Sequence, residues 1–410
     1  MLYRLEVENL YSIRDAQALD LTIAPNVPDP DGRFAPIFRG SELRAPKVIA
    51  LYGANASGKT NILKSLEFLI GIFARDSTHR TVPGFFLDRF NDAESCARPI
   101  RIAVEFGGAM NISPKVMARV SSGEEVEHGV YRYELILEVK DGAAVRVASE
   151  SLRQKPKAQG KWQRVFERDA EGNVKDSRSF PISGFQHLLR TLRPNVSVLS
   201  SFAFFQHPTA MLFVEAARTC IFHLSSVHST PDQAMIDFLI QQPEVLSRLN
   251  LELSRIDVGV EGMSFQQRQD APPVLLFKHS GLAVEMPWQL ESQGTRAFIK
   301  LYPTIASGLE SGGVVVIDEL DASIHPLVLP EMLRWFHDRG TRNKSDAQLW
   351  FSCHNPSLLN ELTKEEIVIC EKDRQGRTSF HSLMDVKVRR DENHYRKYLG
   401  GAYGGVPMIG

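Results

Sequence analysis

Cysteine is scarce in this chain of 410 residues, and its four cysteines, Cys96, Cys220, Cys353 and Cys370, lie far apart. No two of them form a C-x-x-C pair, so the sequence has neither the ligand spacing of a zinc site nor a disulfide framework. This pattern fits a protein of the reducing cytoplasm, where thiols stay free.

Long apolar runs are missing as well. No stretch approaches the roughly 20 apolar residues that a transmembrane helix requires. Residues 1–6 lack a basic region followed by a long apolar core, so they do not form a signal peptide. We therefore expect a cytoplasmic protein without membrane contact.

An excess of charge of one sign is also absent, since the formal net charge is −1 at pH 7. This balance gives no overall attraction to nucleic acid or to a membrane, although a local basic groove stays compatible with it. The chain has no internal repeats and no sustained heptads, so long coiled-coil arms are not expected. Its length suffices for one large domain or two.

The strongest positive signal begins with the apolar run Val48–Tyr52, which predicts a buried strand. Residues 53–60 fit the phosphate-loop pattern G-x-x-x-x-G-K-[ST], and Ile62, Leu63 and Leu66 then recur at helical spacing. Glycines allow a tight turn whose N–H groups point at phosphate oxygens. A chance glycine turn is the alternative, and the strand and helix on its flanks argue against it. We predict that a nucleotide contacts Gly53, Ala54, Asn55, Ala56, Ser57, Gly58, Lys59, Thr60 and Asn61.

Two side chains of this loop have the chemistry that bound ATP requires. Lys59 can reach the β- and γ-phosphates, which makes it a catalytic residue, and the Thr60 hydroxyl can ligate Mg²⁺. The sequence therefore predicts ATP and Mg²⁺ as the cofactors.

Two carboxylates end a second apolar run, residues 313–317, which predicts another buried strand. Ligands of open parallel sheets bind at the carboxyl ends of the strands, where Asp318 and Glu319 lie. We expect Asp318 to hold Mg²⁺, and Glu319 to orient and deprotonate the attacking water. A solvated acidic turn is the alternative, and the phosphate loop upstream disfavours it. Asp321 then begins a loop that can contact a partner subunit.

Two further signals are weaker. His354 ends an apolar run before an Asn-Pro breaker, and from a strand end it can donate a hydrogen bond to the γ-phosphate. A lone histidine is more often structural, but its place after the acidic strand favours a catalytic role. Ser292 and Gly294 precede a helix, where a hydroxyl and free N–H groups make an anion site, although any helix N-cap looks similar.

The remaining pattern predicts an α/β protein with a β meander followed by a helical region. We expect a nucleotide lobe over residues 1–180, a helical lobe over 181–310 and a return to the nucleotide lobe over 311–410. Strands are expected at residues 2–8, 18–23, 100–106, 130–139, 145–152, 162–169, 274–277 and 282–286, and helices within 185–253, 297–309 and 327–339.

The four signals in this order resemble the ABC-type ATPase head of SMC- and RecF-like proteins. By this resemblance residues 53–60 match the Walker A motif, and Asp318 with Glu319 matches the Walker B motif. Residues 292–295 match a degenerate signature motif, and residues 7–14 are similar to the opening hairpin of those heads. Asp321 then has the D-loop position and His354 is the switch histidine.

A closer similarity covers nearly the whole chain. Residues 52–63, 291–296, 317–326 and 398–407 resemble bacterial AAA-type ATPases that are related to the OLD family and linked to abortive infection. The ATPase subunit of the PARIS anti-phage system looks like a relative of this chain.

The resemblance implies an ATP-hydrolysing switch or scaffold subunit of an anti-phage defence system. Two heads would pair head to tail, in a homodimer or a higher homo-oligomer, so that Ser292 of one chain closes on the γ-phosphate at Lys59 of another. A separate effector such as a nuclease is expected. The alternative is a RecF- or SMC-like ATPase of DNA repair or DNA loading, although composition does not support DNA binding. A Q-loop glutamine is not evident among Gln154, Gln159 and Gln163.

Overall fold

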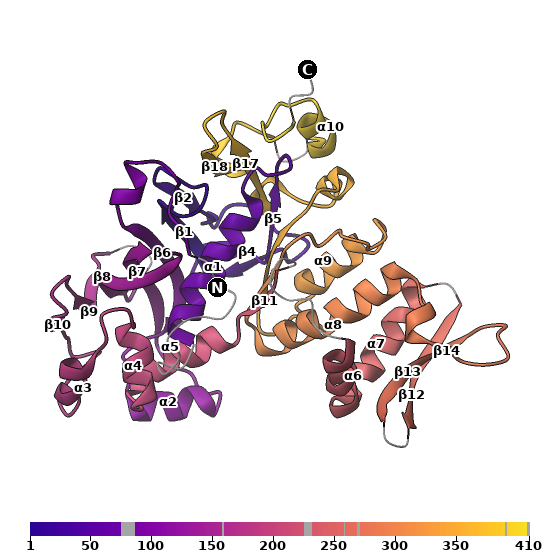
Figure 1. Cartoon of the computed structure of the whole chain (residues 1–410), viewed down its shortest axis with the longest axis horizontal. Coiled ribbons are helices and arrows are strands. Elements are labelled where there is room, and N and C mark those ends of the chain that lie inside the picture. Colours follow the sequence, from indigo (N-terminus) through magenta and orange to yellow (C-terminus); the bar gives the residue numbers. More distant parts are fainter. Residues whose placement is uncertain are drawn as a thin grey trace.

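The computed structural model describes residues 1–74, 87–157, 160–224, 232–257, 259–268, 271–389 and 392–407. Two large sheets and a projecting lobe make up the molecule (Figure 1). Helices and sheets are both present, so the architecture is α/β, as the sequence predicted.

The central sheet has the strand order β11-β15-β16-β5-β17-β18, and only the edge strand β18 runs antiparallel to its neighbour. All residues of β5 and β16 are buried, which is the pattern of parallel strands covered on both faces. The carboxyl ends of β5, β15 and β16 consequently meet at one edge. The bounds are β5 Val48–Tyr52, β11 Ile221–His223, β15 Val314–Ile317, β16 Gln348–Ser352, β17 Ile367–Lys372 and β18 Thr378–Ser382.

The second sheet is antiparallel, with the order β10-β9-β8-β7-β6-β1-β2. It contains the predicted opening hairpin and the predicted meander. The segment between β6 and β7 contains helix α2 (Pro114–Ser121). The bounds are β1 Leu2–Glu8, β2 Gln17–Asp20, β6 Ile100–Ala109, β7 His128–Lys140, β8 Ala143–Lys155, β9 Gln163–Arg168 and β10 Val174–Lys175, with a separate ribbon of β3 (Phe34–Pro36) and β4 (Arg44–Pro46).

Helix α1 (Lys59–Ala74) lies between the two sheets. Its buried side chains, Ile62 and Leu66 among them, share one core with Ile49 and Leu51 of β5 and with the inner face of the antiparallel sheet. The alternate residues of β5 face a second core with helices α8 (Gln293–Ser311) and α9 (Leu329–His337). Strand β5 therefore has an apolar neighbour on each face, and this burial fixes where the glycine loop begins.

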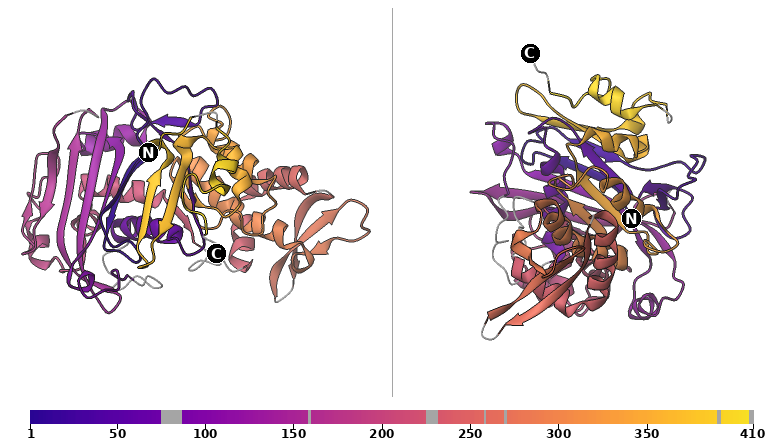
Figure 2. Two further views of the ribbon diagram at one scale, coloured as in Figure 1. Left: turned by 90° about the horizontal axis from the view of Figure 1, so that it is seen from above. Right: turned by 90° about the vertical axis from the view of Figure 1, so that its right-hand side faces the viewer.

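The expected helical lobe of residues 181–310 is divided in space. Helices α3 to α5 lie beside the antiparallel sheet, α4 and α5 pack on α1, and β11 joins the central sheet. Of residues 181–310, the part from α6 onward forms the lobe that projects in Figure 2. The bounds are α3 Gln186–Thr191, α4 Val198–Phe204, α5 Pro208–Arg218, α6 Asp232–Gln241, α7 Pro243–Ile256 and α8 Gln293–Ser311.

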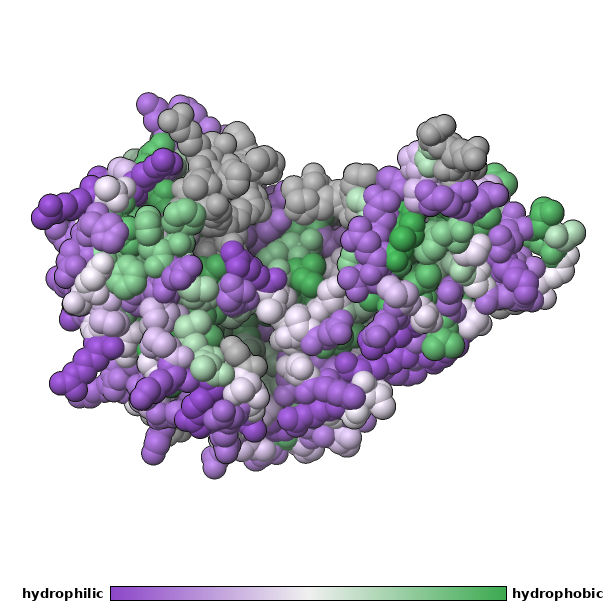
Figure 3. Space-filling view, turned by 90° about the horizontal axis from the view of Figure 1, so that it is seen from below, coloured by the Kyte–Doolittle hydropathy of each residue, from purple (hydrophilic) through white to green (hydrophobic). Residues whose placement is uncertain are grey.

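The projecting lobe also carries a small sheet of β12 (Val260–Arg268), β13 (Ala271–His279) and β14 (Met286–Pro287). Strand β12 was not predicted. The strand expected at 282–286 is wrong over most of its length, because the chain turns at Gly281 with φ +82° and pairs only at its end. In the view from below, hydrophilic residues cover much of the surface of the projecting lobe and of the body that contains the two large sheets (Figure 3).

The last part of the chain adds helix α9 (Leu329–His337), strands β17 and β18, and helix α10 (His394–Leu399). Single 3-10 turns lie at η1 Ser95–Ala97, η2 Trp288–Leu290, η3 Pro356–Asn360, η4 Lys364–Glu366 and η5 Leu383–Asp385. Within the described residues, none of the helices combines the length and apolar character needed to cross a membrane.

Candidate functional site

The glycine loop connects the end of β5 directly to the start of α1. A side chain at Gly53 would collide with the carbonyl oxygen of Cys370, which belongs to the neighbouring strand β17. Gly58 has φ +106° and Ala56 has φ +62°, so the loop passes twice through the left-handed region. These constraints hold the loop in a narrow turn ahead of the helix N-terminus.

Lys59 folds back over this loop. Its Nζ donates hydrogen bonds to the carbonyl oxygens of Gly53 at 2.8 Å and Ala54 at 3.0 Å. Only 5% of the residue is exposed, and burial lowers the pKa of its ammonium group. The cation therefore lies beneath the turn, where phosphate oxygens are better acceptors than the two carbonyls.

Asp318 accepts hydrogen bonds at the end of β15 from two hydroxyl groups. Thr60 Oγ1 donates to its two carboxylate oxygens at 3.1 and 3.0 Å, and Ser352 Oγ donates to Oδ1 at 2.5 Å. Thr60 is the second residue of α1, so this contact joins the helix to the acidic strand. A hydroxyl and a carboxylate are the oxygen ligands that Mg²⁺ prefers.

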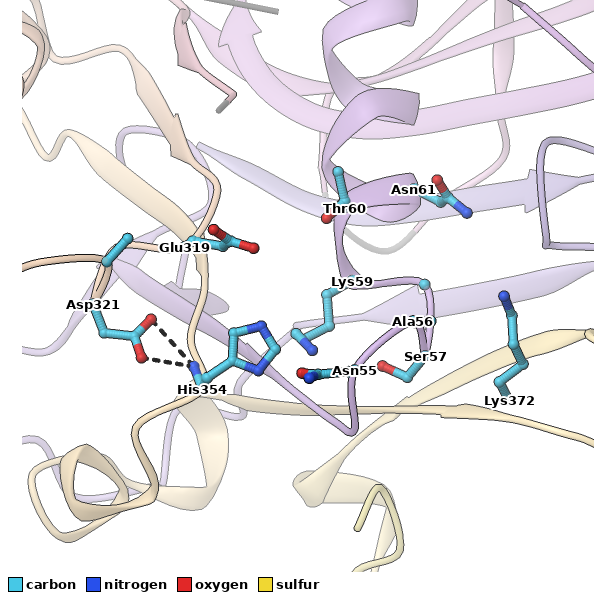
Figure 4. Close-up of a pocket in the computed structure, with 12 residues that line it drawn as sticks. Asn55, Ala56, Ser57, Lys59, Thr60, Asn61, Glu319, Asp321, His354 and Lys372 are labelled. Atoms are coloured by element: carbon cyan, nitrogen blue, oxygen red, sulfur yellow. Dashed lines mark hydrogen bonds between the residues drawn. The ribbon is translucent and has the colours of Figure 1, made fainter. Parts of the chain in front are cut away.

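A cavity of about 710 Å³ opens in front of the loop. Glu319, Asp321 and His354 line one side of it, and Lys372 lines the other (Figure 4). The backbone N–H of His354 donates to the Asp321 carboxylate at 3.2 and 3.0 Å, which holds the two predicted motifs together. Asn55 to Asn61 complete the lining, so most of the predicted phosphate-loop residues meet in one cavity.

Cys353 directly precedes His354, and the burial of its thiol determines its reactivity. Cys353 is buried, and burial raises the pKa of its thiol to about 12. The group therefore stays protonated at neutral pH and is not an activated nucleophile.

A chain of hydrogen bonds supports the loop from the opening hairpin, and the sequence did not reveal it. Asn61 Nδ2 donates to Ser12 Oγ at 2.6 Å, which lies 2.7 Å from Thr378 Oγ1. Thr378 Oγ1 in turn donates to the carbonyl oxygen of Ser57 at 2.8 Å. Since Thr378 gives its proton to Ser57, Ser12 must donate to Thr378, and the whole chain has one direction.

The C-terminal glycine turn packs against the base of the loop. The backbone N–H of Gly405 donates to Glu371 Oε1 at 3.0 Å, and Tyr398 OH donates to the Gly405 carbonyl at 3.1 Å. The Tyr398 ring also meets Tyr52 edge to face, with centroids 5.8 Å apart. The motif at residues 398–407 thus braces the end of β5.

The structure does not bring Ser292 and Gly294 to this cavity. They line a separate cavity of about 390 Å³ between the start of α8 and the loop around Ser323. Ser292 is exposed and caps α8, since its Oγ accepts the backbone N–H of Thr295 at 3.1 Å. Within one chain, then, the predicted signature residues do not lie with the phosphate loop.

The glutamines considered for a Q-loop do not line the phosphate cavity either. Gln154 is buried on β8 and donates to Ser179 Oγ at 3.1 Å, and Gln163 is exposed at the start of β9. Gln159 lies outside the described residues.

The oxygen set around Asp318 fits a Mg²⁺ ion that the protein binds through few ligands. Among the residues that the structure describes, no group of three or more His, Cys, Asp or Glu side chains converges on a metal position. Mg²⁺ is commonly held by one or two protein oxygens together with water and substrate phosphates. Thr60 and Asp318 match that requirement.

A strand, a glycine loop and a helix, with a buried lysine and a hydroxyl paired to an acidic strand end, define the phosphate site of a P-loop ATPase. Comparison with known proteins agrees. Residues 48–186 and 216–360 match the family described as "AAA domain, putative AbiEii toxin, Type IV TA system". This match spans well over half of the chain, which therefore belongs to that family.

A search of curated proteins finds no match. Among solved structures, the chain is similar to the Smc head domain with a coiled coil and joint derived from Pyrococcus yayanosii, at 10% sequence identity and a TM-score of 0.43. The similarity covers 98% of this chain and 99% of that chain.

Proposed function

We propose that this chain binds Mg²⁺-ATP in the 710 Å³ cavity and hydrolyses it. The observation that carries the proposal is the pairing of Thr60 with Asp318 at 3.0–3.1 Å, directly beside Lys59 and Glu319. This arrangement of a hydroxyl, two carboxylates and a buried cation around one space supports the proposal.

Each side chain then has one task. Lys59 donates to oxygens of the β- and γ-phosphates in place of its two carbonyl acceptors. The backbone of the turn keeps its conformation during this exchange. Glu319 takes a proton from the water that attacks the γ-phosphorus, while the bond from that phosphorus to the bridging oxygen of ADP breaks. His354 donates to a γ-phosphate oxygen. Mg²⁺, when held by Thr60 and Asp318, neutralises charge on the phosphates.

We place a second copy of the chain over the cavity. Ser292 and Gly294 begin α8 at an exposed corner, and in their own chain they line another cavity. The N-terminus of a 19-residue helix favours anions. A head-to-tail dimer uses this free end as the second wall of the ATP site.

The cellular role that we propose is an ATP-dependent switch in bacterial defence against phage. The family to which the chain belongs is described as a putative toxin of a type IV toxin–antitoxin system, and this description supports the proposal. The cavity holds the groups for phosphoryl chemistry on a nucleotide, so we place the toxic activity on a separate effector such as a nuclease. Hydrolysis would then control when that effector is held or released.

Phosphate release by the purified chain with Mg²⁺-ATP tests the enzymatic part. Wild type and Lys64→Ala should turn over alike, because Lys64 lies on α1 outside the cavity lining. Lys59→Ala should lose at least about 100-fold in rate, as expected on removing one charge-stabilising group. A wild-type chain that releases no phosphate, alone or with DNA added, would contradict the proposal. Turnover that depends on DNA would instead favour the RecF-like alternative.

A further inference from the structure

Ser352 connects the two predicted catalytic motifs, and neither motif includes it. It is the last residue of β16, it is 0% exposed, and it lies two positions before His354. Its Oγ lies 2.5 Å from Asp318 Oδ1 and 2.7 Å from the backbone nitrogen of Glu319. One buried hydroxyl therefore contacts both carboxylate residues at the end of β15.

The directions of these two hydrogen bonds follow from the groups involved. A backbone N–H can only donate, so the Ser352 oxygen accepts from Glu319. The single hydroxyl proton is then left for Asp318, whose ionised carboxylate can only accept. Thr60 supplies a second hydroxyl donor to the same carboxylate. Two hydroxyl donors thereby fix the orientation of the Asp318 carboxylate.

The same serine also holds the backbone of Glu319 in an unfavourable conformation. Glu319 has φ +53°, a left-handed value that is unfavourable for a non-glycine residue. The Glu319 N–H reaches Ser352 Oγ, and the next N–H, that of Leu320, donates to the Ser352 carbonyl at 3.0 Å. The peptide groups before and after the Cα of Glu319 are therefore both hydrogen-bonded to Ser352, which keeps this turn from relaxing to an extended form.

We infer that Ser352 is a positioning residue for the ATPase reaction, and that it fixes the metal-binding carboxylate and the base in one orientation. The inference rests on the proposed function, since it assigns Asp318 and Glu319 the roles given there. His354 follows the end of β16 by two residues, and its backbone N–H donates to Asp321. Ser352 thus couples the strand of the switch histidine to the acidic turn.

The test compares Ser352→Ala, Ser352→Thr and the control Ser382→Ala. Ser382 is also 0% exposed, lies at the end of β18 in the same sheet, and its hydroxyl accepts the local N–H of Met384. Steady-state kcat and KM for ATP are measured, together with the ratio of affinities for a fluorescent ATP analogue with and without Mg²⁺. Hydrogen exchange of the peptide covering residues 318–321 is followed without nucleotide.

Ser352→Ala should lower kcat by about 10- to 100-fold, as loss of a hydrogen bond behind a metal ligand does, with KM changed less than about threefold. The gain in affinity from Mg²⁺ should shrink by a similar factor, and exchange at 318–321 should become faster. Ser352→Thr restores the hydroxyl and should recover most of each quantity. Ser382→Ala should match wild type.

The inference is overturned if Ser352→Ala stays within about twofold of wild type in both kcat and the Mg²⁺ ratio. It is also overturned if Ser382→Ala falls equally, which would indicate general loosening of the sheet, or if Ser352→Thr recovers nothing. Failure of the proposed function can be told apart from failure of this inference. If the wild-type chain hydrolyses no ATP, the effect of Mg²⁺ on analogue affinity and the hydrogen exchange at residues 318–321 still test the role of Ser352.

Discussion

Mixing two inactive variants tests the head-to-tail assembly most sharply. Lys59→Ala removes the cation under the phosphate loop, and Ser292→Arg places a long charged side chain at the exposed start of α8. The two residues line different cavities of one chain. If one ATP site uses the loop of one chain and the serine of another, each variant alone has no complete site.

The expected recovery follows from counting sites. Random pairing of equal amounts of two chains gives about half heterodimers in a symmetric dimer. In each heterodimer one site combines both substitutions and the other combines the native loop with the native serine. The mixture should therefore show about one quarter of wild-type turnover per chain, whereas each variant alone should show about 1% or less.

The assay is phosphate release from Mg²⁺-ATP after the variants are mixed and allowed to exchange subunits. Binding of a fluorescent ATP analogue to Ser292→Arg checks that its own phosphate loop is intact, and we expect wild-type affinity. No recovery in the mixture, despite detectable heterodimers, would refute the head-to-tail site. Full turnover by Ser292→Arg alone would remove Ser292 from the reaction.

Three further outcomes are expected. Glu319→Gln should bind ATP without hydrolysing it and should shift in native mass from monomer to dimer with Mg²⁺-ATP; normal turnover would disprove its role as the base. Gly53→Ala should weaken binding of the ATP analogue by more than about tenfold, since its Cβ meets the Cys370 carbonyl, while Gly340→Ala should not, because a Cβ there makes only an ordinary contact with the Asp338 side chain. Glu366 is fully buried; burial raises its pKa, but the His337 hydrogen bond and the charges of His337 and Arg33 outweigh this and lower it. Its pairing therefore stabilises the fold above the usual glutamate pKa and is lost as pH falls through the lower folded value. Glu366→Gln should cost about 3–5 kcal/mol in denaturant unfolding at pH 7, and this cost should decrease as pH falls below the usual glutamate pKa; a cost that does not change with pH would contradict this reasoning.

The phosphate loop and its flanking elements could be predicted because their signals are local. Strand β5 and the following helix pattern lie within about two dozen residues, and hydrophobic spacing specifies both. The same holds for β15, whose four β-branched residues lead directly to Asp318. For each of these segments, the local sequence pattern is sufficient to predict the structure.

The supports of the site could not be predicted in this way, because they depend on contacts between distant segments. Ser352 and Thr378 are ordinary serine and threonine residues at strand ends, and only strand pairing brings them to the loop. β11 is three residues long and gives no periodic pattern, so its place in the central sheet was hidden. Gly405 acts through a single N–H that reaches Glu371.

The order of strands in the central sheet has a consequence for the growing chain on the ribosome. Strand β5 is made well before its neighbours β16 and β17, and Ser57 and the Thr378 that supports it are 321 residues apart. At about 5–20 residues per second, roughly 15 to 65 s separate the two during synthesis. A nascent chain therefore carries the phosphate-loop motif before the strands that flank and support it exist, and the loop gains this support only after Thr378 has been made.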